Sequence, residues 1–312
     1  MMKLATPPRP QALPAIRAMK TVAEADGALD PQERRMIELA LDAYTFTETV
    51  DALAAITPEA LASTLTDRPA RRELIQRLVM LVTLDGEVSD DELRLVEAYA
   101  AALDVDEPCV RALRHLVEGR LRRMMLGLLR RSFFPDLLRT VWRQQGALGF
   151  VRLGLAMLGL DRGLATRFQA LGELPADTLG NALYHQYVDN GFTQPGRAGG
   201  PPSPMLFHDL GHVIAGVGTQ AEEEMLVCAF QCGYMGERGL VMYVIIAMLF
   251  QLGVEPIAKL RGVEPHKRLV DVDRFQAAYE TGQRLDRSLI GWDPWPHMHR
   301  PVAEVRAELG LG

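Results

Sequence analysis

The fold around the candidate site residues is determined by one stretch of sequence, Phe207-His-Asp-Leu-Gly-His-Val-Ile-Ala-Gly-Val-Gly-Thr-Gln-Ala-Glu-Glu-Glu224. A helix advances ~100° per residue, so His208 and His212 project from nearly the same face of one helix. Gly216 and Gly218 then interrupt the helix and let the chain reverse. The stretch therefore predicts two adjacent helices.

Four side chains of this stretch carry the chemistry of metal ligands. Asp209 is offset by one step from His208 and can contribute an oxygen from the flank, while Glu224 follows His212 after eleven residues. Two imidazoles and two carboxylates that converge from adjacent helices predict a divalent-metal site. The alternative is that the histidines are structural and that Glu224 belongs to a solvated, acidic helix start.

The composition is that of a folded, soluble protein, with 48% hydrophobic and 24% charged residues among 312. A net charge of −6 argues against wholesale nucleic-acid binding. Three cysteines form no disulfide framework and suit a reducing cytoplasm. The apolar run Leu240–Phe250 is shorter than the ~20 residues of a spanning helix. We therefore expect a cytoplasmic protein, with a homo-oligomer among the open possibilities.

The sequence predicts an all-α fold. Leu, Ala, Arg, Glu and Met dominate, and no sustained period-two alternation is present. We expect a flexible tail over residues 1–14 and a helical domain over 15–119. Basic amphipathic connecting helices are expected over 120–170, followed by a helical metal-site domain over 171–312.

The region 15–119 contains an internal near-repeat. Ala25-Asp-Gly-Ala-Leu-Asp-Pro-Gln-Glu33 aligns with Leu84-Asp-Gly-Glu-Val-Ser-Asp-Asp-Glu92. Each copy is an Asp-Gly turn followed by a helix start. Asp30 and Ser89 are the expected N-caps, and the glutamate that ends each copy closes a capping box.

These two motifs resemble the TerB-like tellurite-resistance family, an all-helical domain of pseudo-repeated helices. The matching positions are Asp26, Gly27 and Glu33 in the first motif and Asp85, Gly86 and Glu92 in the second. The resemblance implies that the acidic residues of this set could form second cation sites. Capped turns explain the same residues without a cation.

The segment from 120 to 167 inverts the charge balance of the chain. It contains ten arginines against two aspartates, a net +8 that leaves −14 for the remaining residues. A basic amphipathic helix with aromatic residues favours an anionic membrane surface, here the inner face of the membrane. The residues expected to face the membrane are Arg122, Arg123, Arg130, Arg131, Phe133 and Phe134. The alternative is a stripe that packs on a neighbouring domain and leaves its arginines in water.

The last region resembles the coenzyme Q biosynthesis protein 4 family, whose signature is His-Asp-x-x-His, eleven residues and then Glu. Here the signature is formed by His208, Asp209, His212 and Glu224. Leu174–Tyr184 upstream is similar to a second segment of the family. Tyr279–Gly282, Trp292-Asp293 and Val305–Gly310 are similar to its C-terminal part. The similar region covers a little under half of the chain, and the TerB-like region is outside the usual family architecture.

The resemblance implies a membrane-associated helical protein that holds a divalent metal, usually zinc, beside an apolar cavity for polyprenyl quinone precursors. Family members take part in ubiquinone assembly, alongside other quinone-biosynthesis enzymes, and are linked to oxidative decarboxylation at ring carbon one. Methionines and the run Leu240–Phe250 are expected to supply apolar surface for such a lipid near the metal site.

Two other functions are compatible with the sequence. A metal-dependent phosphohydrolase of the HD superfamily would use His208 and Asp209 with His185 and a later aspartate, Asp271 or Asp273. A non-catalytic adaptor or stress protein would bind lipid in its C-terminal half and sense cations in its N-terminal half. The residues that would carry catalysis are not apparent in any of these functions.

Overall fold

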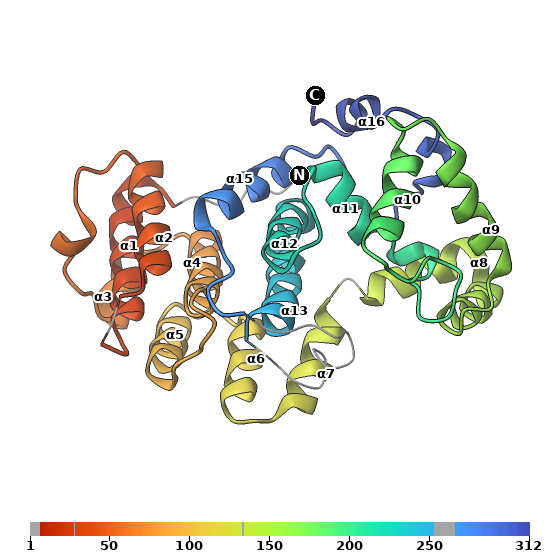
Figure 1. Ribbon diagram of the computed structural model, residues 1–312. Helices are drawn as coiled ribbons and strands as arrows, with labels where there is room; N and C mark the ends of the chain where they lie inside the picture. Colours follow the sequence, from red (N-terminus) through yellow and green to blue (C-terminus); the bar gives the residue numbers. More distant parts are fainter. Residues whose placement is uncertain (1–6, 28, 133, 253–265) are drawn as a thin grey trace. The chain divides into compact units, whose positions relative to one another are not determined.

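The computed structural model describes residues 7–27, 29–132, 134–252 and 266–312. Within these ranges the chain is helical, and its one paired extended contact is an isolated bridge between Thr178 and Pro301 (Figure 1). The α-helices are α1 (Arg9–Ala23), α2 (Pro31–Ala43), α3 (Pro58–Thr64), α4 (Arg68–Leu81), α5 (Asp90–Ala102), α6 (Pro108–Val117), α7 (Leu121–Arg131), α8 (Phe134–Met157), α9 (Arg162–Gln169), α10 (Leu179–Asp189), α11 (Phe207–Ala215), α12 (Ala221–Met235), α13 (Gly239–Phe250), α15 (Val272–Gln283) and α16 (Val302–Glu308). Short 3-10 helices are η1 (Val50–Ala52), η2 (Ala170–Glu173), η3 (Ser203–Met205), η4 (Gly236–Arg238) and η5 (Trp295–His297). The all-α prediction is confirmed.

The chain divides into two compact units whose boundaries differ from the expected ones. The first unit is formed by Met1–Arg130 and Gly236–Gln276, and the second by Arg131–Met235 and Ala277–Gly312. Residues 236–276, expected in the C-terminal domain, thus belong with the N-terminal helices. Helix α1 begins at Arg9, inside the expected tail 1–14, whose first six residues lie outside the described ranges.

The near-repeat in the first unit folds as two matching turns, each followed by a capped helix. Asp30 caps α2 and Ser89 caps α5, and both capping boxes are complete, as predicted. Gly27 and Gly86 have φ values of 93° and 89°, which glycine adopts without strain. The Asp-Gly turns therefore start both helices in the same way.

The two glutamates that close these capping boxes meet inside the first unit. Glu33 is 4% exposed and Glu92 is 5% exposed. Burial raises the pKa of Glu33 to about 9, and the neighbouring Glu92 adds to the rise. Burial also raises the pKa of Glu92 to about 6. Two carboxyls so close cannot both ionise cheaply, so they share a proton at neutral pH.

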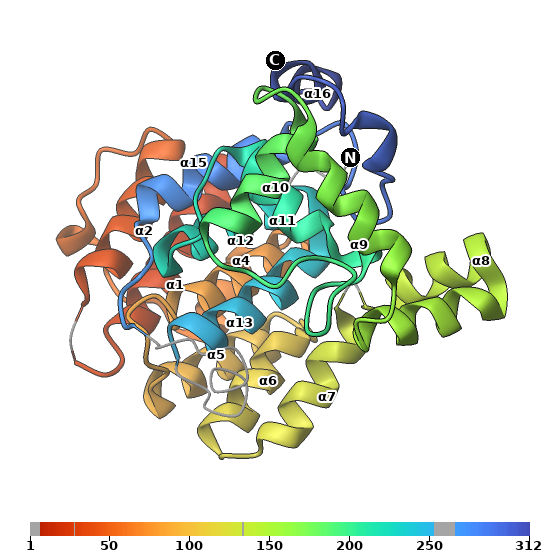
Figure 2. The ribbon, with the colours of Figure 1, turned by 45° about the vertical axis from the view of Figure 1, so that its right-hand side comes forward.

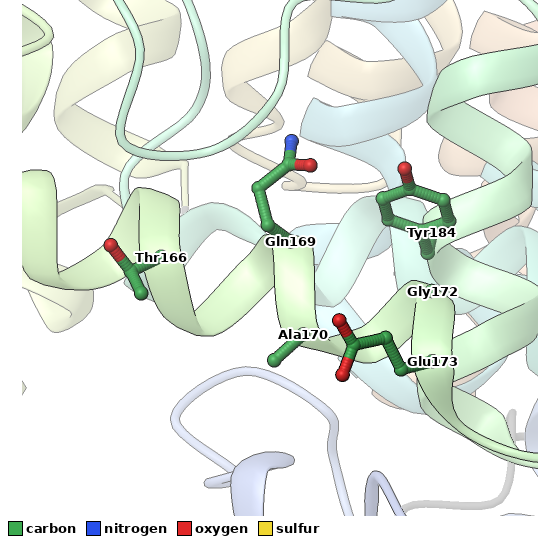
Figure 3. Close-up of a pocket in the computed structure, with 6 residues that line it drawn as sticks. All are labelled: Thr166, Gln169, Ala170, Gly172, Glu173 and Tyr184. Carbon is green, nitrogen blue, oxygen red and sulfur yellow. The ribbon is translucent and has the colours of Figure 1, made fainter.

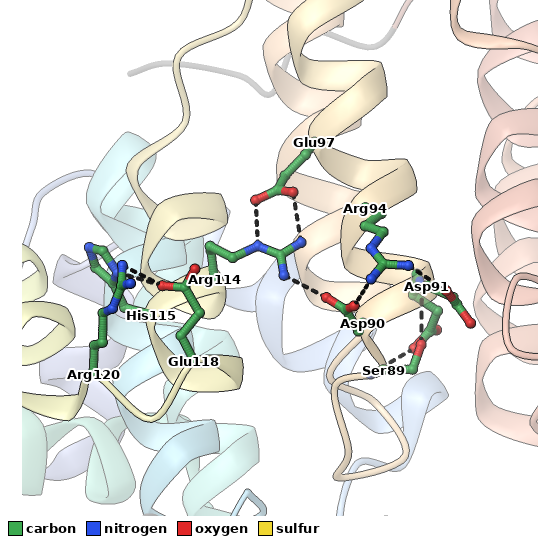
Figure 4. Close-up of polar contacts among 10 residues, drawn as sticks. Ser89, Asp90, Asp91, Arg94, Glu97, Arg114, His115, Glu118 and Arg120 are labelled. Atoms are coloured by element: carbon green, nitrogen blue, oxygen red, sulfur yellow. Dashed lines mark hydrogen bonds and ion pairs between the residues drawn. The ribbon is translucent and has the colours of Figure 1, made fainter.

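An ion-pair network joins α5 to α6 in the first unit (Figure 4). Arg114 on α6 donates to both carboxylate oxygens of Glu97, over 2.9 and 2.7 Å, and to Asp90 over 2.5 Å. Asp90 also pairs with Arg94 one turn further along α5. The bidentate geometry fixes the guanidinium plane and aligns the two helices.

Helix α13 is the apolar run that the sequence singles out, and it forms part of the core of the first unit. Its residues Met242 and Met248 are 7% and 0% exposed, and the helix contacts α4 and α6. The Tyr243 hydroxyl lies 2.9 Å from the Thr83 hydroxyl. A helix that is apolar all round needs cover on every side. Helix α13 therefore serves as part of the core of the first unit, and its role as lipid-binding surface stays a prediction.

The described helices include none that is both long and apolar enough to cross a membrane.

The core of the second unit lies between α9, α10, α11, α12 and the C-terminal segments. Large side chains such as Phe168, Tyr187 and Phe230 are fully buried there. Gly282 lets α15 approach α12 closely, because a Cβ at this position would lie 1.9 Å from the Phe230 carbonyl oxygen. The space at Gly211 on α11 is also tight, because a Cβ there would lie 3.0 Å from Val227 Cγ2 on α12. These close approaches set the positions of the helices that carry the predicted ligands.

We expect the Glu33→Gln variant to be more stable than the native chain, and increasingly so as pH rises. The raised pKa of Glu33 means that the folded state binds more protons than the unfolded state between pH 4.5 and about 9, so stability falls as pH rises through this window. An amide keeps the capping-box contact and removes the charge. The gain in unfolding free energy should be ~2 kcal/mol at pH 8 and much smaller at pH 5.

Urea unfolding at both pH values measures this effect, with the exposed Glu48→Gln as the matched control. An equal change for Glu33→Gln at pH 5 and pH 8 would contradict the shared proton.

Candidate metal centre

Helix α11 presents its two histidines one turn apart, as the four-residue spacing predicts. The rings of His208 and His212 are edge to face, with centroids 5.1 Å apart. The helix ends at Gly216, which has a left-handed φ of 72° and donates its N–H to the His212 carbonyl oxygen. This glycine cap turns the chain back toward α12.

Glu224, in the first turn of α12, lies against both imidazoles. His208 Nε2 is 3.2 Å from Glu224 Oε2, and His212 Nε2 is 3.4 Å from Glu224 Oε1. One ligand atom from each residue lies within 4.8 Å of the others, a group that could hold one ion. The His212 side chain is 2% exposed, Glu224 12% and His208 26%. The cluster is thus nearly closed, with its open side at His208.

The outer ring nitrogens of both histidines have partners that turn Nε2 toward Glu224. His212 Nδ1 lies 2.5 Å from the Gly218 carbonyl oxygen, which can only accept, so Nδ1 carries the hydrogen. His208 Nδ1 contacts the Gln231 amide, with the amide nitrogen at 3.1 Å and the oxygen at 3.3 Å. This is the outer-shell pattern that orients metal-binding histidines.

The charges of the cluster stabilise one another. Burial lowers the pKa of His208, but the hydrogen bond and the charge of Glu224 outweigh it and raise the pKa to about 9. Burial would raise the pKa of Glu224, but hydrogen bonds from His208 and His212 lower it to about 2. Without an ion, the cluster therefore holds a carboxylate beside a protonated imidazole at neutral pH.

Asp209, the fourth predicted ligand, lies beside the group rather than in it. Its Oδ2 accepts a hydrogen bond of 2.7 Å from the Tyr187 hydroxyl on α10. Burial raises the pKa of Asp209, and its charge in turn raises the pKa of His208. One residue of helical rotation separates Asp209 from His208, which turns the carboxylate toward α10. The structure thus brings together three of the four predicted ligands.

The acidic residues predicted as second cation sites do not converge as the residues of the metal centre do. In the described ranges, the metal-ligand group is formed by His208, His212 and Glu224, and the acidic residues of the two turns form no such group. Glu33 and Glu92 close capping boxes, and Asp85 accepts a hydrogen bond from the Glu87 N–H. Burial raises the pKa of Asp85. Asp26 ends the α1 turn without joining a ligand cluster. Capped turns account for what the structure shows at these positions.

The ligand set of an HD phosphohydrolase is not assembled. His185 on α10 is 52% exposed and lies 3.5 Å from Asp189. Asp271 accepts from the Arg274 N–H at the start of α15, and Asp273 pairs with Arg35, both within the first unit. None of these residues belongs to the group of described residues that could hold an ion.

The residues expected to face a membrane lie on α7 and at the start of α8. Arg122, Arg123, Arg130 and Arg131 are exposed, Phe134 is half-buried, and Phe133 lies outside the described residues. The apolar stripe of α7 is divided, with Met124 and Leu128 each 1% exposed. Part of the stripe thus packs on the protein, as the alternative interpretation expected, while the arginines stay in water.

A hollow of about 450 Å³ opens beside α9, η2 and α10 (Figure 3). It is lined by Thr166, Gln169, Ala170, Gly172, Glu173 and Tyr184. Figure 3 shows the amide of Gln169, the carboxylate of Glu173 and the ring of Tyr184 around it. The lining thus mixes polar groups with apolar ones, among them Ala170 and the ring of Tyr184. No motif in the sequence indicates it, because its residues follow one another as ordinary helix and turn positions.

Sequence reasoning missed two residues that shape the centre. Gln231 lies two turns after Glu224 on α12, a spacing that places both on one face of that helix. Tyr187 lies on a separate helix, and its sequence position carries no signal for its contact with Asp209. The Gln231 contact could have been inferred from helical periodicity, whereas the Tyr187 contact depends on tertiary packing.

Comparison with known proteins finds a weak structural similarity and no related sequence. The sequence matches no protein-family model and none of the curated proteins. Among solved structures, the chain is similar to a candidate ubiquinone biosynthesis protein from Nostoc punctiforme, with 17% sequence identity and a TM-score of 0.35. The alignment covers 66% of this chain and 98% of that chain. Similarity at this level does not establish a shared function, so the function must be inferred from the site.

We expect metal binding at this site to release protons and to strengthen as pH rises. The raised pKa of His208 means that its imidazole is protonated at pH 7, and an ion can bind only after that proton leaves. Affinity for zinc should therefore rise about tenfold per pH unit from pH 7 and level off above pH 9.

Calorimetric titration with zinc, in two buffers that differ in protonation enthalpy, counts the protons released. About one proton per ion is expected from His208 at pH 7. A binding enthalpy that is the same in both buffers would show that no ligand gives up a proton and would exclude this site.

Proposed function

We propose that this chain is a metal-binding, lipid-handling protein that binds polyprenyl quinone precursors beside a divalent ion at a membrane surface. The observation that carries the proposal is the convergence of His208 Nε2, His212 Nε2 and a Glu224 carboxylate oxygen within 4.8 Å. Both outer ring nitrogens are engaged by protein groups, which leaves the inner nitrogens directed at the Glu224 carboxylate, where an ion would take the place of a proton.

The donor set suits a divalent ion that also takes an external ligand. Two histidines and one glutamate are the protein ligands of many catalytic zinc sites, which keep a position open for water or substrate. The same donors also suit manganese and iron, and zinc is the ion that the family resemblance favours. A bound ion of this kind supplies Lewis acidity toward phenol or carboxylate oxygens of an aromatic head group.

The protein's own residues would orient such a head group and control protons around it. His208 is the most exposed ligand and marks the side from which a ligand enters. Asp209 is held by the Tyr187 hydroxyl next to the centre, and burial raises the pKa of its carboxyl.

The lipid part of the proposal is supported by the resemblance of the site sequence to the coenzyme Q biosynthesis protein 4 family. The spacing of His208, Asp209, His212 and Glu224 follows that family's signature without a gap. A polyprenyl quinone precursor or another isoprenoid lipid is the proposed ligand, and other quinone-biosynthesis enzymes are proposed partners. The oxidative decarboxylation linked to the family is the reaction class to test first.

We expect purified protein to contain about one equivalent of divalent metal per chain. The Glu224→Ala variant should lose it, because two histidines alone leave the ion with too few protein ligands. Elemental analysis by inductively coupled plasma mass spectrometry measures both. Glu222→Ala, two residues earlier in the same acidic turn of α12, is the matched control and should keep its metal. Full occupancy in Glu224→Ala would remove the basis of the proposal.

We also expect an isoprenoid lipid with an oxygenated aromatic ring to bind the metal-loaded protein. Native mass spectrometry of the intact chain, with and without a chelator, reports bound lipid and ion together. Loss of the aromatic lipid on chelation, with a non-aromatic isoprenoid unaffected, is the expected result. An aromatic lipid that stays bound equally well without the ion would place the head group away from the centre.

A further inference from the structure

Helix α8 and the turn after it expose more large apolar side chains than any other described segment. Leu148 and Leu158 are each 67% exposed, Leu160 is 61%, and Trp142 and Val151 are each 58%. Leu148, Val151, Leu155 and Leu158 recur at helical spacing and form one exposed stripe, which we call the α8 stripe. Exposed apolar surface of this extent marks an interaction site in a soluble protein.

Helix α8 is bent sharply in its middle. Gly146 has φ 58° and ψ −148°, which interrupts the helical backbone. The rings of Trp142 and Phe150 have centroids 5.9 Å apart, although eight residues of straight helix would separate them by about 12 Å along the axis. The two halves therefore fold beside each other at Gly146. Figures 1 and 2 both show α8 next to α9 at the margin of the second unit.

The charge around the α8 stripe is positive. Residues 120–167 carry a net +8 against −14 for the remaining residues. Arg143, next to Trp142, is exposed, as are Arg130 and Arg131 just before α8. Arg139 is paired with Asp136 over 2.7 Å, so its charge is already compensated locally. The net positive charge of this segment attracts an anionic surface.

We propose that the α8 stripe inserts into the interfacial layer of an anionic lipid bilayer. A bilayer is favoured over a protein partner because the stripe combines leucines, a tryptophan–phenylalanine pair and arginines, the composition of helices that lie in membrane interfaces. The inference builds on the proposed membrane contact and names residues beyond α7 that make it. It does not depend on the metal.

The test uses the full chain and vesicles of phosphatidylcholine, with or without an equal share of phosphatidylglycerol. The native chain should sediment with the mixed vesicles, bind pure phosphatidylcholine much more weakly, and dissociate as salt is added. Leu148→Ser combined with Val151→Ser should weaken binding to the mixed vesicles about tenfold or more, because both side chains lose apolar area to bury. Val117→Ser combined with Val188→Ser replaces exposed apolar residues elsewhere and should bind like the native chain.

Trp142 provides an independent readout of insertion. Brominated phospholipids should quench its fluorescence, and this part of the quenching should vanish in Trp142→Phe, while Trp292 and Trp295 keep their emission. Equal vesicle binding by the Leu148/Val151 double variant would overturn the proposal. A second result would also overturn the proposal: a native chain that forms a dimer and binds no vesicles, with the double variant monomeric. The stripe would then join two copies of the chain.

The metal content of the Leu148/Val151 double variant separates this inference from the proposed function. Unchanged metal with lost vesicle binding is the expected result and leaves the centre intact. A native chain that binds anionic vesicles through the α8 stripe but contains no metal would refute the metal-dependent function and leave the membrane contact standing.

Discussion

The charge of Glu224 is the constraint around which the second unit is arranged. A carboxylate that is only 12% exposed is costly unless positive charge or hydrogen bonds compensate it. Two imidazoles from the neighbouring helix provide that compensation, and they can do so only where α11 and α12 approach closely. The glycine cap at Gly216 and the missing side chain at Gly211 make the approach possible. The outer partners of the histidines then follow from the same packing.

Local rules predicted the parts of this structure that depend on neighbouring residues in the chain. The four-residue spacing of His208 and His212 placed both on one helix face, and the reversal at Gly216 brought Glu224 to them. The two capping boxes could be predicted because Asp30 and Ser89 precede Glu33 and Glu92, respectively, by three residues. In each case the interacting groups are separated by one helical turn or one loop, so the backbone geometry is nearly determined by residue type.

Features that depend on tertiary packing were not predictable in the same way. The apolar run of α13 indicated burial, but nothing in it identified α4 and α6 as its neighbours. The rotation of Asp209 toward Tyr187 depends on the position of α10, which no spacing rule encodes. The basic region predicted a membrane surface near α7, whereas the exposed apolar residues concentrate on α8. That difference arises because Met124 and Leu128 of α7 pack on the protein.

The discontinuity of the first unit also bears on how the chain acquires its fold during synthesis. Residues up to Arg130 leave the ribosome long before Gly236–Gln276, so α4 and α6 are made well ahead of α13. Until α13 arrives, the apolar faces of those helices lack their native cover and are open to non-native contacts. The second unit, by contrast, lacks only its C-terminal segment Ala277–Gly312 once Met235 has been synthesised. Translation speed and chaperone access over this interval should therefore influence yield more than they would for a chain whose units follow one another in order.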